Sequence, residues 1–137
     1  MAVSANSIIT PQIPRSATSV ASLANTVLTD SPTGTVKLAG AGPNGARLVK
    51  LAATPRGTVT ATQVQLFRSS DGGVTKRLVR TAVIPAFTLS NTALIATTDL
   101  GYSDDGPMIL GANEELYGAI SVALAAGVVF EAEWADY

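Results

Sequence analysis

The chain has 137 residues, of which 47% are hydrophobic and 5% aromatic, so we expect one domain with an aliphatic core. It contains no cysteine and no histidine, which excludes disulfides, zinc–thiolate sites, histidine-ligated metals and Ser-His-Asp triads. The formal net charge is −1, yet all nine lysines and arginines lie between Arg15 and Arg80, whereas eight of the ten carboxylates follow Thr81.

This charge asymmetry has two readings. We expect the basic and acidic halves to pair within one sheet; the alternative is that oppositely charged faces of neighbouring copies attract, as in a ring or lattice. Nucleic-acid binding is disfavoured because the basic residues are scattered along the sequence and are balanced by a similar number of acidic residues. The first ten residues lack the features of a signal peptide, and the apolar stretch Tyr117–Phe130 is shorter than the roughly 20 residues of a membrane helix. We therefore expect a protein made in the cytoplasm that does not bind membranes.

The first predicted element is an extended N-terminal arm over residues 1–17. Pro11 and Pro14 favour extended backbone around Ile13 and exclude a helix there. The apolar residues of this arm show no hydrophobic period, so they either pack on their own domain or lie on a partner. A short helical turn is compatible with the composition of Ser16–Ala24. The candidate partner-contact residues of the arm are Ile8, Ile9, Ile13 and Arg15.

From residue 18 to residue 137 the sequence predicts a single β domain. Short segments of alternating hydrophobicity are separated by turn clusters such as Asp30–Gly34 and Ala41–Gly45. Val49 and Leu51 are expected to alternate with Leu48 and Lys50 in one of these strands. Seven or eight strands with turns every 8–12 residues indicate an antiparallel β-sandwich or barrel, jelly-roll-like in layout.

The stretch Ser69–Lys76, SSDGGVTK, comes close to the Asp-box pattern S-x-D-x-G-x-T-W of sialidase propeller blades, with Lys76 in place of the tryptophan. An Asp-box is first of all a hairpin turn, in which the aspartate accepts backbone hydrogen bonds and the glycines adopt positive φ. The chain is too short for a propeller. We therefore predict a hairpin capped by Asp71 and no catalytic role.

The last two predicted strands show the clearest alternation. In the segment Leu116–Leu124, one face is expected to carry Leu116, Ile120, Val122 and Leu124. In the strand that follows, Val128, Phe130 and Trp134 are expected to face the core, while Val129, Glu131 and Glu133 face outward.

Two groups of carboxylates are candidates for chemistry. Asp99, Asp104 and Asp105 lie in one glycine-containing loop, which is either a calcium site or a solvated loop. Glu131 and Glu133 resemble the acid pair of a glycoside hydrolase, but the sequence offers few aromatic residues as sugar platforms. The chain has no histidine that could act as a general base and activate its abundant serines and threonines as nucleophiles. We expect a protein that is not an enzyme and has no cofactor.

Several features in order resemble the small head proteins of tailed bacteriophages, including their capsid decoration (cement) proteins. These are the start MAVSANSIITPQ, the Ala/Thr/Val-rich β body, the SSDGG hairpin, VIPA at Val83–Ala86, and the final strand ending in EAEWADY. The resemblance spans most of the chain but is diffuse, and no functional residue can be carried over by motif.

The resemblance implies a structural virion protein that binds the outer surface of a capsid and stabilises it. The implied partners are the major capsid protein and further copies of the chain, with a trimer favoured, and no nucleic acid or membrane. The implied location is the capsid surface. Two alternatives are a phage tail or fibre-associated protein and a carbohydrate-binding β-module.

Overall fold

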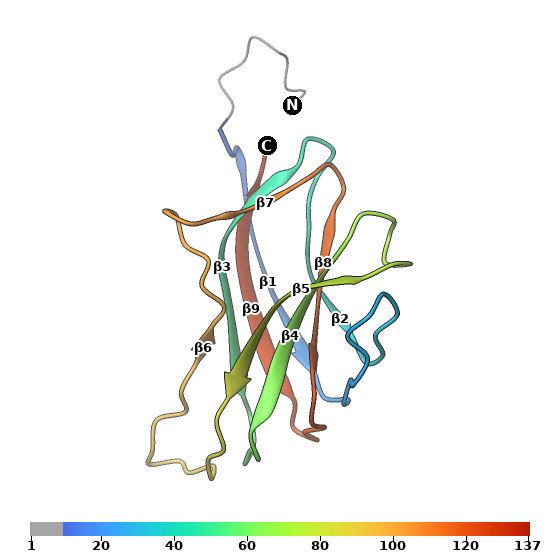
Figure 1. Cartoon of the computed structure of the whole chain (residues 1–137). Helices are drawn as coiled ribbons and strands as arrows, with labels where there is room; N and C mark the ends of the chain where they lie inside the picture. Colours follow the sequence, from blue (N-terminus) through green and yellow to red (C-terminus); the bar gives the residue numbers. More distant parts are fainter. Residues whose placement is uncertain (1–9) are drawn as a thin grey trace.

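The computed structural model describes residues 10–137 and shows an all-β protein, with no helix in that part of the chain. Two antiparallel sheets pack against each other as a β-sandwich (Figure 1), which confirms the predicted fold class. The strands are β1 (Ile13–Ala21), β2 (Val36–Gly40), β3 (Ala46–Pro55), β4 (Thr62–Ser69), β5 (Arg77–Ile84), β6 (Thr98–Asp99), β7 (Met108–Leu110), β8 (Glu115–Ile120) and β9 (Val128–Asp136).

The first sheet has the strand order β1-β9-β3-β6, with β7 also pairing with β3, and the second has the order β2-β8-β4-β5. The edge strands β1 and β2 meet at one side of the sandwich, where the Ser19 hydroxyl donates a hydrogen bond of 2.7 Å to the carbonyl of Lys37. At the opposite side, the Arg80 guanidinium on β5 donates a hydrogen bond of 2.6 Å to the carbonyl of Leu100. The two sides of the sandwich are thus tied by side chain–backbone bonds.

The core lies between the sheets and is mainly aliphatic. Along β9 burial alternates as predicted, with the side chains of Val128, Phe130 and Trp134 inside and those of Glu131 and Glu133 outside. This alternation confirms the predicted faces of the last strand. The largest core side chains from other strands are Leu48, Leu51, Leu66, Ile84, Leu110, Leu116 and Ile120.

Strand β3 departs from the predicted alternation. Leu48 and Leu51 are both fully buried, whereas Lys50 is exposed. The register with β9 shifts between Leu48 and Lys50, so a β-bulge adds one residue to β3 and restores the inward direction at Leu51. The prediction that Val49 and Leu51 lie on the same face of the strand is therefore wrong.

Strand β8 ends earlier than predicted. It stops at Ile120, and Val122 is 41% exposed rather than on the core face. The Ser121 hydroxyl accepts a hydrogen bond from the Gln63 amide, and the Thr62 hydroxyl accepts one from the Val122 amide. These side-chain bonds flank the last backbone bond to β4, of 3.0 Å from the Ser121 amide to the Gln63 carbonyl, where the chain leaves the sheet.

The predicted arm boundary at residue 17 is also wrong. All nine residues from Ile13 to Ala21 pair with β9, so the sheet begins at Ile13, and the suggested helical turn over Ser16–Ala24 is a strand for most of its length. Backbone pairing with β9 outweighs the weak local preference. Pro14 is accommodated because β1 is an edge strand.

The segment of residues 22–34, hereafter the covering segment, lies against the outer side of the second sheet. Val64 and Leu66 of β4 point into the core, yet Gln65 between them is only 1% exposed. The buried Asn25 side chain donates a hydrogen bond of 2.8 Å to Gln65 Oε1, and its own oxygen accepts one of 2.9 Å from the Thr33 amide. The second sheet is therefore buried on both faces at β4.

The ion pairs explain the charge asymmetry of the sequence. Within residues 10–137, four of the five ion pairs join a base from the first half to a carboxylate from the second half, which confirms that the halves neutralise each other inside the fold. The fifth joins Arg77 to Asp30. The four pairs are Arg15–Asp136, Lys37–Glu115, Lys50–Glu131 and Arg68–Glu114.

Candidate functional site: the groove between the edge strands

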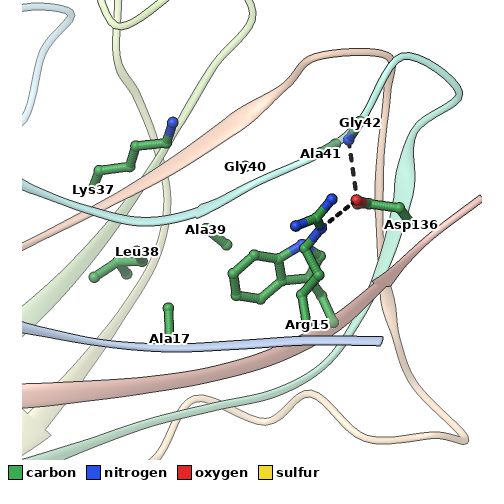
Figure 2. Close-up of a pocket in the computed structure, with 10 residues that line it drawn as sticks. Arg15, Ala17, Lys37, Leu38, Ala39, Gly40, Ala41, Gly42 and Asp136 are labelled. Carbon is green, nitrogen blue, oxygen red and sulfur yellow. Dashed lines mark hydrogen bonds and ion pairs between the residues drawn. The ribbon is translucent and has the colours of Figure 1, made fainter. Parts of the chain in front are cut away.

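A groove of about 380 Å³ opens between β1 and β2 and extends from Lys37 to the Arg15–Asp136 ion pair (Figure 2). In residues 10–137, β1 pairs only with β9 and β2 only with β8, so each strand presents an unpaired backbone edge here. Half of the ten lining residues are alanine or glycine. The lining residues are Arg15, Ala17, Lys37, Leu38, Ala39, Gly40, Ala41, Gly42, Trp134 and Asp136.

Asp136 anchors the mouth of this groove. Its carboxylate accepts a hydrogen bond of 2.6 Å from Arg15 Nε and one of 3.2 Å from the Gly42 amide, as Figure 2 shows. The Asp136 side chain is 4% exposed, whereas the Arg15 side chain is half exposed. One buried carboxylate therefore holds the start of β1 and the chain after β2 together.

Trp134 is the direct cross-strand neighbour of Arg15 and also lines the groove. The residue is 8% exposed, and its indole Nε1 is buried with no hydrogen-bond partner among the described residues. A buried donor without an acceptor costs on the order of 1–3 kcal/mol. It is the single side-chain donor or acceptor of this kind in residues 10–137, which marks the groove wall as unusual.

A second hollow of about 590 Å³ lies on the other side of Arg15, over the outer face of the first sheet. Its lining includes positively charged side chains, Arg15 and Arg47, and negatively charged ones, Glu133 and Asp104. The Arg47 guanidinium donates a hydrogen bond to the backbone carbonyl of Asp104 and ties the loop before β7 to β3. Arg15 thus stands between two hollows at one corner of the sandwich.

The residues predicted to contact a partner are placed as follows. Ile13, the first residue of β1, is 45% exposed, and Arg15 lies at the mouth of the groove. Ile8 and Ile9 lie outside the described residues. The prediction did not include Trp134 or the groove, although the run of small residues at Ala39–Gly42 beside a lysine and a proline turn was a weak signal for a close backbone approach.

The Asp-box-like stretch forms the predicted hairpin between β4 and β5. The Asp71 carboxylate accepts hydrogen bonds from the Thr75 amide and the Ser69 hydroxyl, which hold the pKa of Asp71 below its ordinary value of 3.8. Gly72 and Gly73 adopt positive φ. Lys76, which replaces the tryptophan of the pattern, lies 4.7 Å from the ring centre of Tyr117. The structure confirms the predicted hairpin and its Asp71 cap.

Among the candidate carboxylates, Glu131 and Glu133 lie on the same outer face of β9, whereas Asp99, Asp104 and Asp105 form no group in residues 10–137 that could hold a metal ion. Glu131 forms an ion pair of 2.6 Å with Lys50, and both Glu131 and Glu133 are exposed on the outer face of β9. The Asp99 carboxylate accepts a hydrogen bond from the Gly101 amide. Within residues 10–137, no three His, Cys, Asp or Glu side chains are grouped so that they could hold a metal ion. Nor does that part of the chain contain a helix long and apolar enough to cross a membrane.

Glu114 accepts three hydrogen bonds that brace the second sheet. Arg68 donates two hydrogen bonds of 2.7 and 2.9 Å to its carboxylate, and the Gly111 amide donates a third. Both side chains are mostly buried, and the bonds from Arg68 lower the pKa of Glu114 below its ordinary value of 4.5. The brace ties β4 to the loop that enters β8.

The protein should lose stability in acid partly through Glu114. Because the folded state lowers this pKa, the contribution is complete above about pH 4.5 and is lost as the pH falls through the folded-state pKa. We expect Glu114→Gln to reduce the free energy of unfolding at pH 7 by about 2 kcal/mol, since hydrogen bonds to charged groups contribute about 1.5–3 kcal/mol. Urea unfolding between pH 3 and pH 7 measures this, with the exposed Glu133→Gln as the control. Parallel pH profiles for Glu114→Gln and the parent protein would contradict the prediction.

The search of protein-family models finds no match for this chain, and no curated protein shows a significant match to it.

Proposed function

We propose that this chain is a structural virion protein that binds the outer surface of a tailed-phage capsid and stabilises it. Its partner is the major capsid protein, it works as a homo-oligomer with a trimer favoured, and it catalyses no reaction. The proposal rests first on the resemblance of the sequence to phage head and decoration proteins. It also rests on how the sandwich joins its N-terminal segment.

The observation that carries the proposal is the position of that junction. β1 enters the sandwich at an exposed edge, beside an open groove, and its first side chains are solvent-exposed from Ile13 onward. The residues before β1 therefore attach at a corner that is accessible to a large partner. Repeated copies on a symmetric surface bind firmly even when each contact is weak, because many contacts act together.

The polar residues of the fold also support a structural role. The cross-half ion pairs, the Asp71 turn and the Arg68–Glu114 brace all use their charges within the sandwich. Tyr117 and Tyr102 each lie under a cation of the same chain, and Trp134 is buried, so these three rings are not exposed as sugar platforms. This favours the capsid role over the carbohydrate-binding alternative.

Co-sedimentation with expanded, undecorated heads of the same phage tests the proposal. We expect saturable binding at a fixed ratio to the major capsid protein. Deletion of residues 1–12, which leaves β1 whole, should abolish binding, and Ile13→Ser should weaken it by about tenfold, since an exposed apolar contact at an interface is worth about 1–2 kcal/mol. Leu94→Ser, on a remote loop where Leu94 is 93% exposed, is the matched control.

The outcomes separate the alternatives. No binding of the full chain to heads would reject the capsid proposal, and immunogold labelling of whole virions would then show a tail location if the protein belongs there. Full binding after deletion of residues 1–12 would reject the role of the N-terminal segment. Equal loss for Ile13→Ser and Leu94→Ser would show that the effect is not specific to the β1 corner.

A further inference from the structure

The groove between β1 and β2 has the chemistry of a site for an extended chain. Two edge strands with unpaired backbone groups form its sides, and Ala17 and Gly40 leave room for a backbone to approach. The buried Trp134 Nε1 lacks an acceptor, and a peptide carbonyl is the acceptor that an extended segment supplies.

The charges at the groove select for an uncharged occupant. Asp136 is already satisfied by Arg15 and Gly42, and Lys37 by Glu115 at 2.5 Å. A carboxylate or an ammonium group entering the groove would compete with one of these pairs and leave a charge without its partner. A segment with small polar and apolar side chains carries no such cost.

Residues 1–9 of this sequence, MAVSANSII, fit these requirements. They contain no charged side chain, they are mostly small, and they end in two isoleucines that gain from burial. An extended segment of nine residues spans about 30 Å, longer than the groove-lining stretch of β2. The segment joins the described chain at Thr10, at the corner where Arg15 lines the groove and Pro11 lines the second hollow.

The backbone of residues 10–14 continues along β9. The Gln12 amide donates a hydrogen bond of 2.8 Å to the carbonyl of Asp136, so the chain still follows β9 beyond the start of β1. Pro11 and Pro14 restrict the residues before them to extended backbone. A reversal into the same groove would require a tight turn where the sequence disfavours one.

We infer that the groove between β1 and β2 binds residues 1–9 of a second copy of this chain as an added strand, with a backbone carbonyl accepting the hydrogen bond from Trp134 Nε1. This is recognition by strand addition at a sheet edge, in which the main chain supplies affinity and small pockets supply specificity. It builds a contact between copies that needs no capsid. It therefore goes beyond the proposed function and can fail independently of it.

The test uses the single tryptophan as a probe. In ¹⁵N-labelled protein, Trp134 gives one indole N–H resonance, which shifts downfield when the group gains an acceptor. We expect the full chain to associate in analytical ultracentrifugation and to shift this resonance with rising concentration. A variant lacking residues 1–9 should be monomeric, and a synthetic peptide of residues 1–12 added to it should restore the shift.

A substitution that fills the groove supplies the second measurement. A Cβ at Gly40 would meet only the flexible end of Lys37, at 3.2 Å, so Gly40→Leu is expected to fold and to block both association and peptide binding. Gly106→Leu, in an exposed loop where a Cβ meets only Ser103 at 3.8 Å, should behave like the parent.

Two results would overturn the inference. A full chain that stays monomeric, with an indole resonance unaffected by deletion of residues 1–9, would show that the groove is not their site. A shift that depends on residues 1–9 but not on concentration would show binding within one molecule. Because no heads are present, neither result bears on capsid binding.

Discussion

Asn25→Ala should lower the free energy of unfolding by about 3 kcal/mol. The Asn25 side chain is fully buried. It links the covering segment to Gln65 of β4, and within the covering segment it accepts a hydrogen bond from the Thr33 amide. Alanine leaves the Gln65 oxygen and the Thr33 amide without these partners, and each buried group left unpaired costs about 1–3 kcal/mol. The loss is large because the site is closed to water.

Urea unfolding measures the change, and amide exchange of residues 22–34 shows where it acts. Asn91→Ala, on an exposed loop, is the matched control and should stay within about 0.5 kcal/mol of the parent. The role assigned to Asn25 would be wrong if its variant were as stable as the Asn91 variant. Fast exchange confined to the covering segment would show that the segment opens as a separate unit.

Phe67→Ala should cost about 4 kcal/mol, in the range of about 3–5 kcal/mol for truncation of a buried phenylalanine. Phe67 is fully buried but is not part of the cluster between the sheets, because it points to the outer side of β4, between Tyr117 of β8 and Leu78 of β5. Its burial shows that the outer side of the second sheet has a small core of its own. Phe130→Ala, in the main core, should be equally costly.

Thermal and urea unfolding of three variants tests this second core. Phe87→Ala is the control, because Phe87 is only partly buried against the main cluster and should cost clearly less. A cost for Phe67→Ala near that of Phe87→Ala would mean that the outer side of β4 contributes little to stability. Similar losses at Phe67 and Phe130 would establish two cores of comparable weight.

The sequence predicted best where a strand has one buried and one exposed face. The alternation of β9 placed Phe130 and Trp134 in the core and Glu131 outside, because period 2 is a direct consequence of strand geometry. The Asp71 turn was predictable for a similar reason, since its hydrogen bonds are local. Both features depend on residues close together in the chain.

The features that were missed depend on pairing between distant segments. The bulge at Leu48–Lys50 arises from register with β9, and β1 is a strand because β9 lies beside it. The groove and the buried Asn25–Gln65 bond likewise join elements separated by tens of residues. For the candidate site, the sequence pointed to Arg15, which lines the groove, and to Ile13, which does not, but it contained no direct sign of the opening between the edge strands that Trp134 lines.

The central position of β9 in the first sheet has a consequence for how the protein is made. β9 separates β1 from β3, so the earliest strand pairs with residues that are synthesised more than a hundred positions later. Until residues 128–136 leave the ribosome, β1 has no partner and the first sheet cannot close. Folding should therefore follow translation rather than accompany it, and it should be slow, as is usual for folds in which distant segments must meet first. During that interval the exposed strand edges need protection from aggregation.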